Sequence, residues 1–233
     1  MSRRRSILVR PVTATAFFDR ASELARLQQA VESLRKGSPQ WVAVLGSRKV
    51  GKTSLLLELM RREHREDTAF AVLDTFEDGP PSAELFRRLA LRVVDAFFAR
   101  ELGASLESLS ARPDEYKATL VESKSCAKLP RELRTLLLGL PEVRADMRLA
   151  ELALRLGERL ATALDRHCVV AWDEFQALAR LKLRAAGDAL RLARAVWQKH
   201  QRTAYFVCGS ERTMLRDLVS RVKSERSPCS RTM

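Results

Sequence analysis

Four short runs of consecutive apolar residues divide the chain into segments. Each run has the length of a strand and stops at a glycine or an aspartate. Continuous apolar runs, unlike alternating ones, are typical of strands that are buried on both faces of a parallel sheet. They predict four strands, at Trp41–Leu45, Phe70–Leu73, Cys168–Trp172 and Ala204–Cys208.

The segments between these runs carry apolar residues three and four positions apart, which is the spacing of one face of an α-helix. Gly37 and Gly103 follow two of the helical segments. Many helices are followed by a residue in the left-handed conformation, and glycine is favoured at that position. Strands that alternate with long helices indicate a three-layer α/β domain, with a mostly parallel sheet and helices on both faces. The predicted helices cover about Ser22–Lys36, Ser82–Leu102 and Met147–Arg166, and another begins near Lys52.

The stretch 104–145 is less regular, because Pro113, Pro130 and Pro141 break it into short pieces. We predict that it forms a helical insertion or a mobile flap. The rest of the chain up to residue 223 is expected to complete one domain. The polar, basic segment 224–233 is expected to be a disordered tail.

Composition limits the class of protein. The 233 residues carry 42 Lys+Arg against 29 Asp+Glu, a net charge of +13, yet 46% of them are hydrophobic, which excludes a disordered polycation. The four cysteines form no CxxC pair, which argues against a zinc site or a disulfide framework and favours the cytoplasm. Arg10 and Pro11 interrupt the apolar run near the N-terminus, so we expect neither an export signal nor a membrane span.

Residues 46–53, Gly-Ser-Arg-Lys-Val-Gly-Lys-Thr, match the P-loop pattern GxxxxGK[ST] between a predicted strand and a predicted helix. A chance match in a chain of this composition has a probability of about 0.002. In a P-loop the backbone amides cradle phosphates, Lys52 would reach the β- and γ-phosphates, and the Thr53 hydroxyl would bind Mg²⁺. The predicted nucleotide-binding residues are Gly46, Ser47, Arg48, Lys49, Val50, Gly51, Lys52, Thr53 and Ser54.

Two acidic residues, Asp173 and Glu174, end the third predicted strand about 120 residues after the P-loop. Asp173 can support Mg²⁺, and Glu174 can take a proton from an attacking water, so the pair favours a hydrolase over a protein that only binds nucleotide. Gln176 follows two residues later. It either contacts the water shell of the metal or the substrate, or is an ordinary polar residue at a helix start.

The fourth predicted strand ends at Gly209-Ser210. If this strand lies between the first and the third, the Ser210 hydroxyl can sense the γ-phosphate; alternatively, Ser210 caps the next helix. The chain contains no Asn, so the guanine-reading motif Asn-Lys-x-Asp cannot occur. Adenine is therefore favoured, and the predicted ligands are ATP and Mg²⁺.

Four segments of the chain follow one another in a distinctive order: Phe18–Leu24, Gly46–Leu56, Val169–Gln176 and Phe206–Glu211. Together they resemble the archaeal-type P-loop ATPases, which belong to the AAA+-like and STAND group of additional-strand ATPases. The resemblance covers about 17–75 and 167–218. It implies that Arg20 contributes to binding the nucleotide base, although Asp19 and Ala21 replace the Gly and the first Glu of the family's Gly-Arg-Glu-x-Glu-Leu segment.

Those families continue past the sensing strand into a fifth strand, a helical lid and a winged-helix domain, whereas this chain ends 23 residues after Ser210. The resemblance therefore implies that the lid and the winged helix are absent. Either they are supplied from elsewhere, or the chain is a truncated or frame-shifted copy with impaired turnover. Arg212, Arg216 and Arg221 are candidate arginine fingers, but an exposed helix surface predicts arginines equally well.

These residues support three functional hypotheses. The first is an ATP-binding, Mg²⁺-dependent P-loop ATPase that hydrolyses ATP to ADP and phosphate, with Glu174, Lys52 and Ser210 catalytic and with Thr53 and Asp173 at the metal. The second is a nucleotide-gated switch or scaffold with little turnover, which acts with a protein partner or as an oligomer. The third is association with nucleic acid, which rests on charge alone, although basic residues beside Glu are also typical of solvated helices. Its candidates are Arg3, Arg4, Arg5, Arg180, Lys182, Arg184, Arg191 and Arg194.

Overall fold

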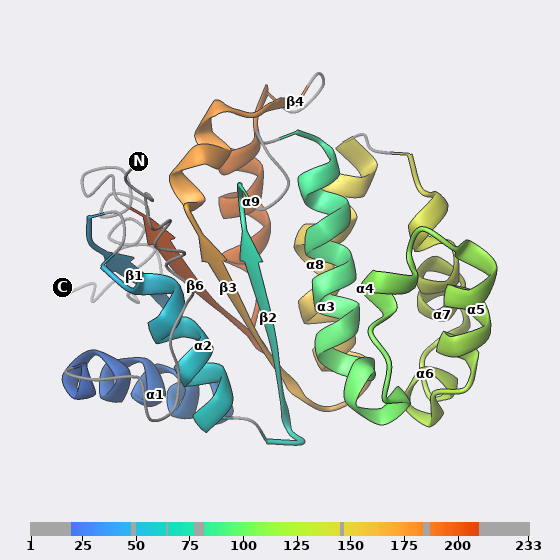
Figure 1. Cartoon of the computed structure of the whole chain (residues 1–233), viewed down its shortest axis with the longest axis horizontal. Coiled ribbons are helices and arrows are strands. Elements are labelled where there is room, and N and C mark those ends of the chain that lie inside the picture. The colour runs from blue at the N-terminus through green and yellow to red at the C-terminus, as the bar shows by residue number, and fades with distance from the viewer. Residues whose placement is uncertain are drawn as a thin grey trace, which may run out of the picture.

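A computed structural model describes residues 20–47, 50–63, 65–76, 82–144, 147–183 and 187–209 (Figure 1). Arg48, Lys49, Ser210, the arginines that follow it and the predicted tail 224–233 lie outside these ranges. The described ranges contain the four predicted strands and the four predicted helices, which are confirmed apart from small shifts at their ends.

The central sheet has four strands, all parallel, in the order β1-β6-β3-β2. Thus β6 lies between β1 and β3, which is the condition that we set for a sensing residue after β6. The two outer strands, β1 and β2, are the first and second along the chain. The strands are β1 (Trp41–Leu45), β2 (Thr68–Asp74), β3 (His167–Asp173) and β6 (Thr203–Gly209).

Helices cover both faces of the sheet, so the predicted three-layer α/β fold is confirmed (Figure 1). One face is covered by α1 (Ala21–Arg35) and α2 (Lys52–Arg62), and the other by α3 (Glu84–Leu102), α8 (Met147–Ala163) and α9 (Ala189–Trp197). In the part of the chain that the structure describes, none of the helices combines the length and apolar character of a membrane span.

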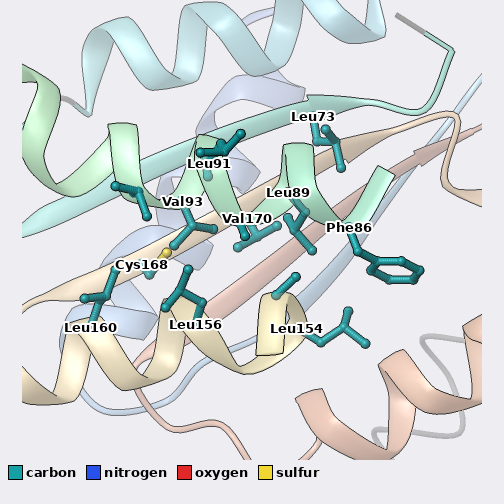
Figure 2. Close-up of a cluster of buried hydrophobic side chains, with 14 of the residues drawn as sticks. Leu73, Phe86, Leu89, Leu91, Val93, Leu154, Leu156, Leu160, Cys168 and Val170 are labelled. Carbon is teal, nitrogen blue, oxygen red and sulfur yellow. The ribbon is translucent and has the colours of Figure 1, made fainter. Parts of the chain in front are cut away.

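Alternate residues of the strands build two separate apolar cores, because successive strand side chains point to opposite faces. On β3, Val169 and Ala171 pack in the core under α1 and α2. Cys168, Val170 and Trp172 pack in the core under α3 and α8. Figure 2 shows this second core, where side chains of α3 and α8 meet those of β2 and β3. Both faces of β3 are thus buried, which explains its continuous apolar run.

Helices α1, α3 and α8 end just before a residue with a positive φ angle. Gly37 and Gly103 are left-handed, with φ of 77° and 64°, and confirm the predicted ends of α1 and α3. Helix α8 ends at Ala163 rather than at the predicted Arg166. The reason is a turn in which Asp165 adopts a positive φ of 50°, after which Arg166 leads directly into β3.

The segment between α3 and α8 forms short helices that lie beside α3 (Figure 1). Pro113 occupies the first turn of one of them, where a missing N–H is tolerated. Leu106, Tyr116 and Leu137 are fully buried and belong to the same core as α3 and α8. The elements are α4 (Leu106–Leu109), α5 (Pro113–Val121), α6 (Lys124–Ala127), α7 (Arg131–Leu138) and the 3₁₀ helix η2 (Leu140–Glu142).

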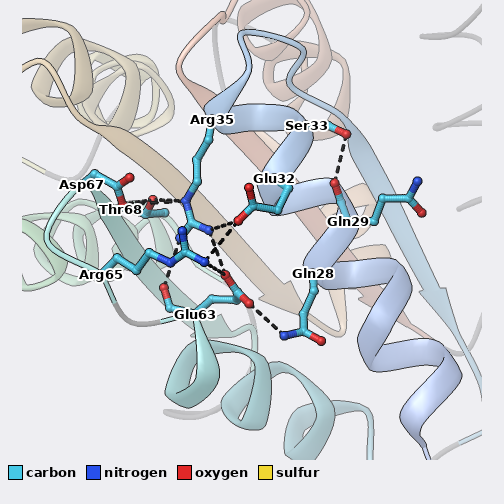
Figure 3. A network of polar contacts seen from close by, with 9 residues as sticks. All are labelled: Gln28, Gln29, Glu32, Ser33, Arg35, Glu63, Arg65, Asp67 and Thr68. Atoms are coloured by element: carbon cyan, nitrogen blue, oxygen red, sulfur yellow. Dashed lines mark hydrogen bonds and ion pairs between the residues drawn. The ribbon is translucent and has the colours of Figure 1, made fainter.

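A polar network joins α1, the end of α2 and the start of β2 at the amino edge of the sheet (Figure 3). The Arg35 guanidinium donates to Glu32 Oε1 at 2.6 Å, to Glu63 Oε2 at 2.8 Å and to Thr68 Oγ1 at 3.1 Å. Gln28 donates to the other Glu63 oxygen at 2.8 Å. Burial alone would raise the pKa of Glu63, but the hydrogen bonds from Gln28 and Arg35 outweigh it and lower the pKa.

Candidate functional site

The candidate site lies at the carboxyl edge of the sheet, opposite the Arg35 network. In the register of the parallel strands, Asp173 lies beside Asp74, and Leu45 lies beside Gly209. The backbone N–H of Gly46 donates to the Gly209 carbonyl at 3.3 Å, which joins the start of the P-loop to the end of β6. Ligands of open α/β sheets bind at this edge, because the loops after the strands meet there.

The two glycines of the P-loop suit it for different reasons, Gly51 through its backbone conformation and Gly46 through close packing. Gly51, which caps the N-terminus of α2, has a φ of 80°, a conformation that residues with a Cβ adopt at a cost. A Cβ on Gly46 would lie 2.9 Å from Val50 Cγ2, so the Val50 side chain would have to shift to make room for it. No side chain caps the N-terminus of α2. A helix N-terminus with such a loop before it favours a bound anion, because backbone N–H groups and the helix dipole both attract negative charge.

Lys52, at the start of α2, is only 5% exposed. Its ammonium donates to the carbonyls of Gly46 at 3.1 Å and Ser47 at 3.0 Å. Among the described residues, no carboxylate lies within ion-pair distance of this ammonium. Because a buried charge without a counter-charge is costly, Lys52 has a strong preference for an anion, and a phosphate group fits it.

Thr53 and Asp173 meet although 120 residues separate them in sequence. The Thr53 hydroxyl donates to Asp173 Oδ2 in a short contact, and Asp173 is 5% exposed. Both side chains offer the hard oxygen ligands that Mg²⁺ prefers. Within the described ranges, no group of three His, Cys, Asp or Glu side chains could hold a metal ion. The donor set therefore fits Mg²⁺ that keeps waters and binds together with a nucleotide, rather than a cage built of protein ligands alone.

Thr75, which was not predicted from the sequence, holds the end of β3 in place. Its backbone N–H and its hydroxyl donate to the Asp173 carbonyl, at 3.3 and 3.0 Å. The indole N–H of Trp172 donates in turn to the Thr75 hydroxyl at 2.9 Å, and Thr75 is fully buried. These bonds fix the peptide that carries Asp173 and leads to Glu174. The only signal in the sequence is a hydroxyl residue directly after Asp74.

Glu174 has a strained backbone, with φ of 50° and ψ of 37°. A non-glycine residue in this left-handed region is uncommon, and such residues cluster at functional sites. The Glu174 N–H donates to Asp173 Oδ1 at 2.9 Å. The Glu174 carboxylate is half-buried and accepts a hydrogen bond from the Gln176 amide.

The remaining predicted residues divide into three groups. Arg20 lies directly before α1, and its guanidinium donates to the Val50 carbonyl of the P-loop. Ser47 and Val50 are exposed, and Ser54 is buried in α2. Of the candidates for nucleic acid, Arg191 is exposed on α9 and Arg194 is half-buried there, whereas Arg3, Arg4, Arg5 and Arg184 and the side chains of Arg180 and Lys182 lie outside the described part.

Cys208 is buried in β6 near the site, and its thiol is not suited to act as a nucleophile. Burial raises the pKa of Cys208 well above its usual range, and the negative charge of Asp173 raises it further. The thiol therefore stays protonated at neutral pH, and the thiolate that nucleophilic chemistry needs does not form.

The comparisons with known proteins agree with this geometry. A family model described as AAA ATPase domain matches residues 16–203. The chain belongs to the AAA ATPase domain family. The predicted membership of the P-loop ATPases is thereby confirmed, and nucleotide binding is the function that this family shares.

Two of the solved structures found in the comparison match most of this AAA ATPase domain. The Walker-type ATPase PABY2304 of Pyrococcus abyssi has a TM-score of 0.54 and 22% identity, over 91% of this chain and 51% of that chain. The ORC2 protein of Aeropyrum pernix, solved in ADPNP-ADP complexes, has a TM-score of 0.47 and 14% identity, over 88% of this chain and 45% of that chain. This chain thus spans about half the length of either structure. No curated protein matches it.

Proposed function

We propose that this AAA ATPase domain hydrolyses ATP to ADP and phosphate with Mg²⁺. The observation that carries the proposal is the contact between Thr53 and Asp173, which brings two motifs 120 residues apart together. Lys52, one residue before Thr53, is buried there, and no carboxylate of the part of the chain that the structure describes forms an ion pair with it. A phosphate-binding cation, two metal-binding oxygens and a carboxylate base next to them are the parts that phosphoryl transfer to water requires.

Each residue has a distinct role in this proposal. The Lys52 ammonium exchanges the carbonyls of Gly46 and Ser47 for oxygens of the β- and γ-phosphates. The Thr53 hydroxyl and the Asp173 carboxylate hold Mg²⁺, directly or through its waters, instead of each other. Mg²⁺, when bound, neutralises negative charge on the phosphate oxygens.

Glu174 is the proposed general base. It accepts a proton from the water whose oxygen forms a bond to the γ-phosphorus, while the bond from that phosphorus to the β–γ bridging oxygen breaks and ADP leaves. Ser210 stays the proposed sensor of the γ-phosphate because Gly209, the residue before it in sequence, ends the strand that lies between β1 and β3. Arg20 stays a proposed nucleotide-binding residue, supported by its bond to the P-loop.

We further propose that residues 1–223 form one ATPase domain, that 104–145 is an insertion in it, and that it acts in the cytoplasm. The burial of Leu106, Tyr116 and Leu137 in the core of α3 supports the first two points. A fixed helical insertion is favoured over a flap, because leaving this core would expose those apolar side chains.

The test compares the wild-type chain with Lys52→Ala and Glu174→Gln. We expect the wild type to release phosphate from ATP when Mg²⁺ is present and not when it is chelated. Lys52→Ala should lose both nucleotide binding and phosphate release, measured with a fluorescent ATP analogue and a phosphate assay. Glu174→Gln should still bind the analogue but release phosphate about 100-fold more slowly, because the base is lost.

Glu151→Gln is the matched control, since Glu151 lies on the exposed face of α8 and pairs with Arg155. It should behave as the wild type. Equal rates in all variants would contradict the proposed hydrolysis. Tight binding without phosphate release in the wild type would instead favour the nucleotide-gated switch, and preference for GTP over ATP would contradict the adenine assignment.

A further inference from the structure

The amide of Gln176 is hydrogen-bonded to the proposed base. Its Nε2 donates to Glu174 Oε2 at 2.5 Å, and Gln176 is 7% exposed. A buried amide is held in place by its hydrogen bonds, because breaking them without water to replace them is costly. The contact between Gln176 and Glu174 is therefore an ordered contact inside the site rather than a chance contact at the surface.

The segment that carries Gln176 is anchored on both sides. It is the short 3₁₀ helix η3 (Phe175–Arg180), in which Phe175 is fully buried and Ala177 is 2% exposed. The Phe175 ring packs edge-on against Trp172 at 5.3 Å between ring centroids. Because the neighbours of Gln176 are locked in the core, its amide cannot move far from the Glu174 carboxylate.

The two oxygens of the Glu174 carboxylate differ. Oε2 accepts the Gln176 amide, whereas Oε1 has no protein partner among the described residues. The backbone of Glu174 is fixed as well, by its left-handed conformation and by the bond from its N–H to Asp173. One oxygen is thus tethered while the other stays available to a water, which is the arrangement that a general base needs.

We propose that Gln176 is a positioning residue for Glu174, a role that rests on the hydrolysis proposed above. Its amide holds Oε2 so that Oε1 accepts the proton of the attacking water. A carboxylate that is free to rotate would spend less time in the reactive orientation, so the loss of the amide lowers the rate of the chemical step and leaves nucleotide binding intact.

The chain offers a matched control for a merely structural role. Gln28 donates its amide to Glu63 Oε1 at 2.8 Å, in the network at the opposite edge of the sheet (Figure 3). Gln28→Ala and Gln176→Ala each remove one amide-to-carboxylate bond from a partly buried glutamate. Only Gln176→Ala removes it from the proposed base.

The experiment measures kcat, KM and thermal stability for the wild type, Gln176→Ala, Gln176→Glu and Gln28→Ala. We expect Gln176→Ala to lower kcat about 10- to 100-fold with KM within about twofold of the wild type. Gln176→Glu keeps the size of the side chain but lacks the amide donor, so its kcat should be as low as that of Gln176→Ala or lower. Gln28→Ala should keep the wild-type kcat, whatever stability it loses.

A second readout does not depend on turnover. With Mg²⁺ and ADP, aluminium fluoride mimics the transition state, and beryllium fluoride mimics the bound γ-phosphate. Gln176→Ala should weaken the affinity for ADP with aluminium fluoride about 10-fold or more and leave that for ADP with beryllium fluoride unchanged. Gln28→Ala should change neither.

Several results would overturn the proposal. They are an unchanged or raised kcat in Gln176→Ala, an equal loss of kcat in Gln28→Ala, or an equal weakening of both fluoride complexes. If the wild type binds ATP but releases no phosphate, the proposed hydrolysis fails. The fluoride complexes then still decide whether Gln176 positions Glu174.

Discussion

Both edges of the sheet bury charged side chains, but they satisfy them differently. At the amino edge, Arg35 donates to Glu32, Glu63 and Thr68, so the buried guanidinium and carboxylate are compensated by side chains from α1, α2 and β2. At the carboxyl edge, the Lys52 ammonium is bonded to two backbone carbonyls and to no carboxylate of the described residues. We infer that a buried charge stabilises the fold where side chains pair with it, and favours ligand binding where the described residues supply no counter-charge.

The largest effect is expected from Arg35→Leu. This change removes the cation that is hydrogen-bonded to the buried Glu63 carboxylate and leaves, among the described residues, only the exposed Arg65, 4.0 Å away, so the free energy of unfolding should fall by about 3–5 kcal/mol. Urea denaturation at neutral pH measures the change.

Arg155→Leu is the control, because Arg155 and Glu151 form an exposed pair on α8. It should cost at most about 1 kcal/mol. The double variant Arg35→Leu with Glu63→Leu should recover part of the loss, since both members of the buried pair are then removed. If Arg35→Leu costs no more than Arg155→Leu, the amino-edge network does not stabilise the fold as we infer.

Lys52→Met should have a much smaller effect on stability, within about 1 kcal/mol, although Lys52 is as buried as Arg35. The reason is that no carboxylate depends on the Lys52 ammonium among the described residues. The same variant should lose the rise in melting temperature that ATP with Mg²⁺ gives the wild type, because that rise reports ligand binding.

Lys117→Met serves as its control, because Lys117 pairs with Glu142 away from the site. This variant should keep the ATP-dependent rise. A loss of stability in Lys52→Met as large as in Arg35→Leu would remove the contrast between the two edges.

The smallest expected effect is the change in stability that Glu63 contributes at acidic pH. The pKa of Glu63 is lowered from its ordinary value of 4.5, so its ionised form stabilises the fold above pH 4.5, and this contribution is lost as the pH falls below 4.5 through the lower pKa of the folded state. Glu63→Gln should therefore be less stable than the wild type at neutral pH, and the difference should shrink in acid.

Denaturation curves at several pH values measure this change. Glu151→Gln, at an exposed position, should keep the acid dependence of the wild type. A constant difference between Glu63→Gln and the wild type at every pH would show that the ionised carboxylate contributes nothing.

Much of the fold was predictable because its signals are local. The continuous apolar runs identified β2 and β3 to within two residues at either end, and the glycines at 37 and 103 marked the ends of α1 and α3. The end of α8 was predicted three residues late, because the left-handed turn at Asp165 has no glycine to signal it. Local patterns thus identify elements well and miss turns that tolerate a strained ordinary residue.

The candidate site was predictable in part. The P-loop is a local motif, so Lys52 and Thr53 could be proposed as site residues from the sequence, and Asp173 could be proposed from its place after an apolar run. Thr75 was missed because its role depends on the pairing of β2 with β3, which brings together residues about 100 positions apart. The role of Gln176 was left open, because only the folded chain shows which carboxylate its amide binds.

The α/β architecture, the P-loop motif and the acidic strand end can be identified in the sequence alone, because apolar periodicity and the glycines of a tight loop act through neighbouring residues. Only the tertiary structure decided that β6 separates β1 from β3, that Thr53 meets Asp173 and that Gln176 tethers Glu174. Strand order and side-chain pairing are set by how the two cores pack, and packing depends on residues far apart in the chain.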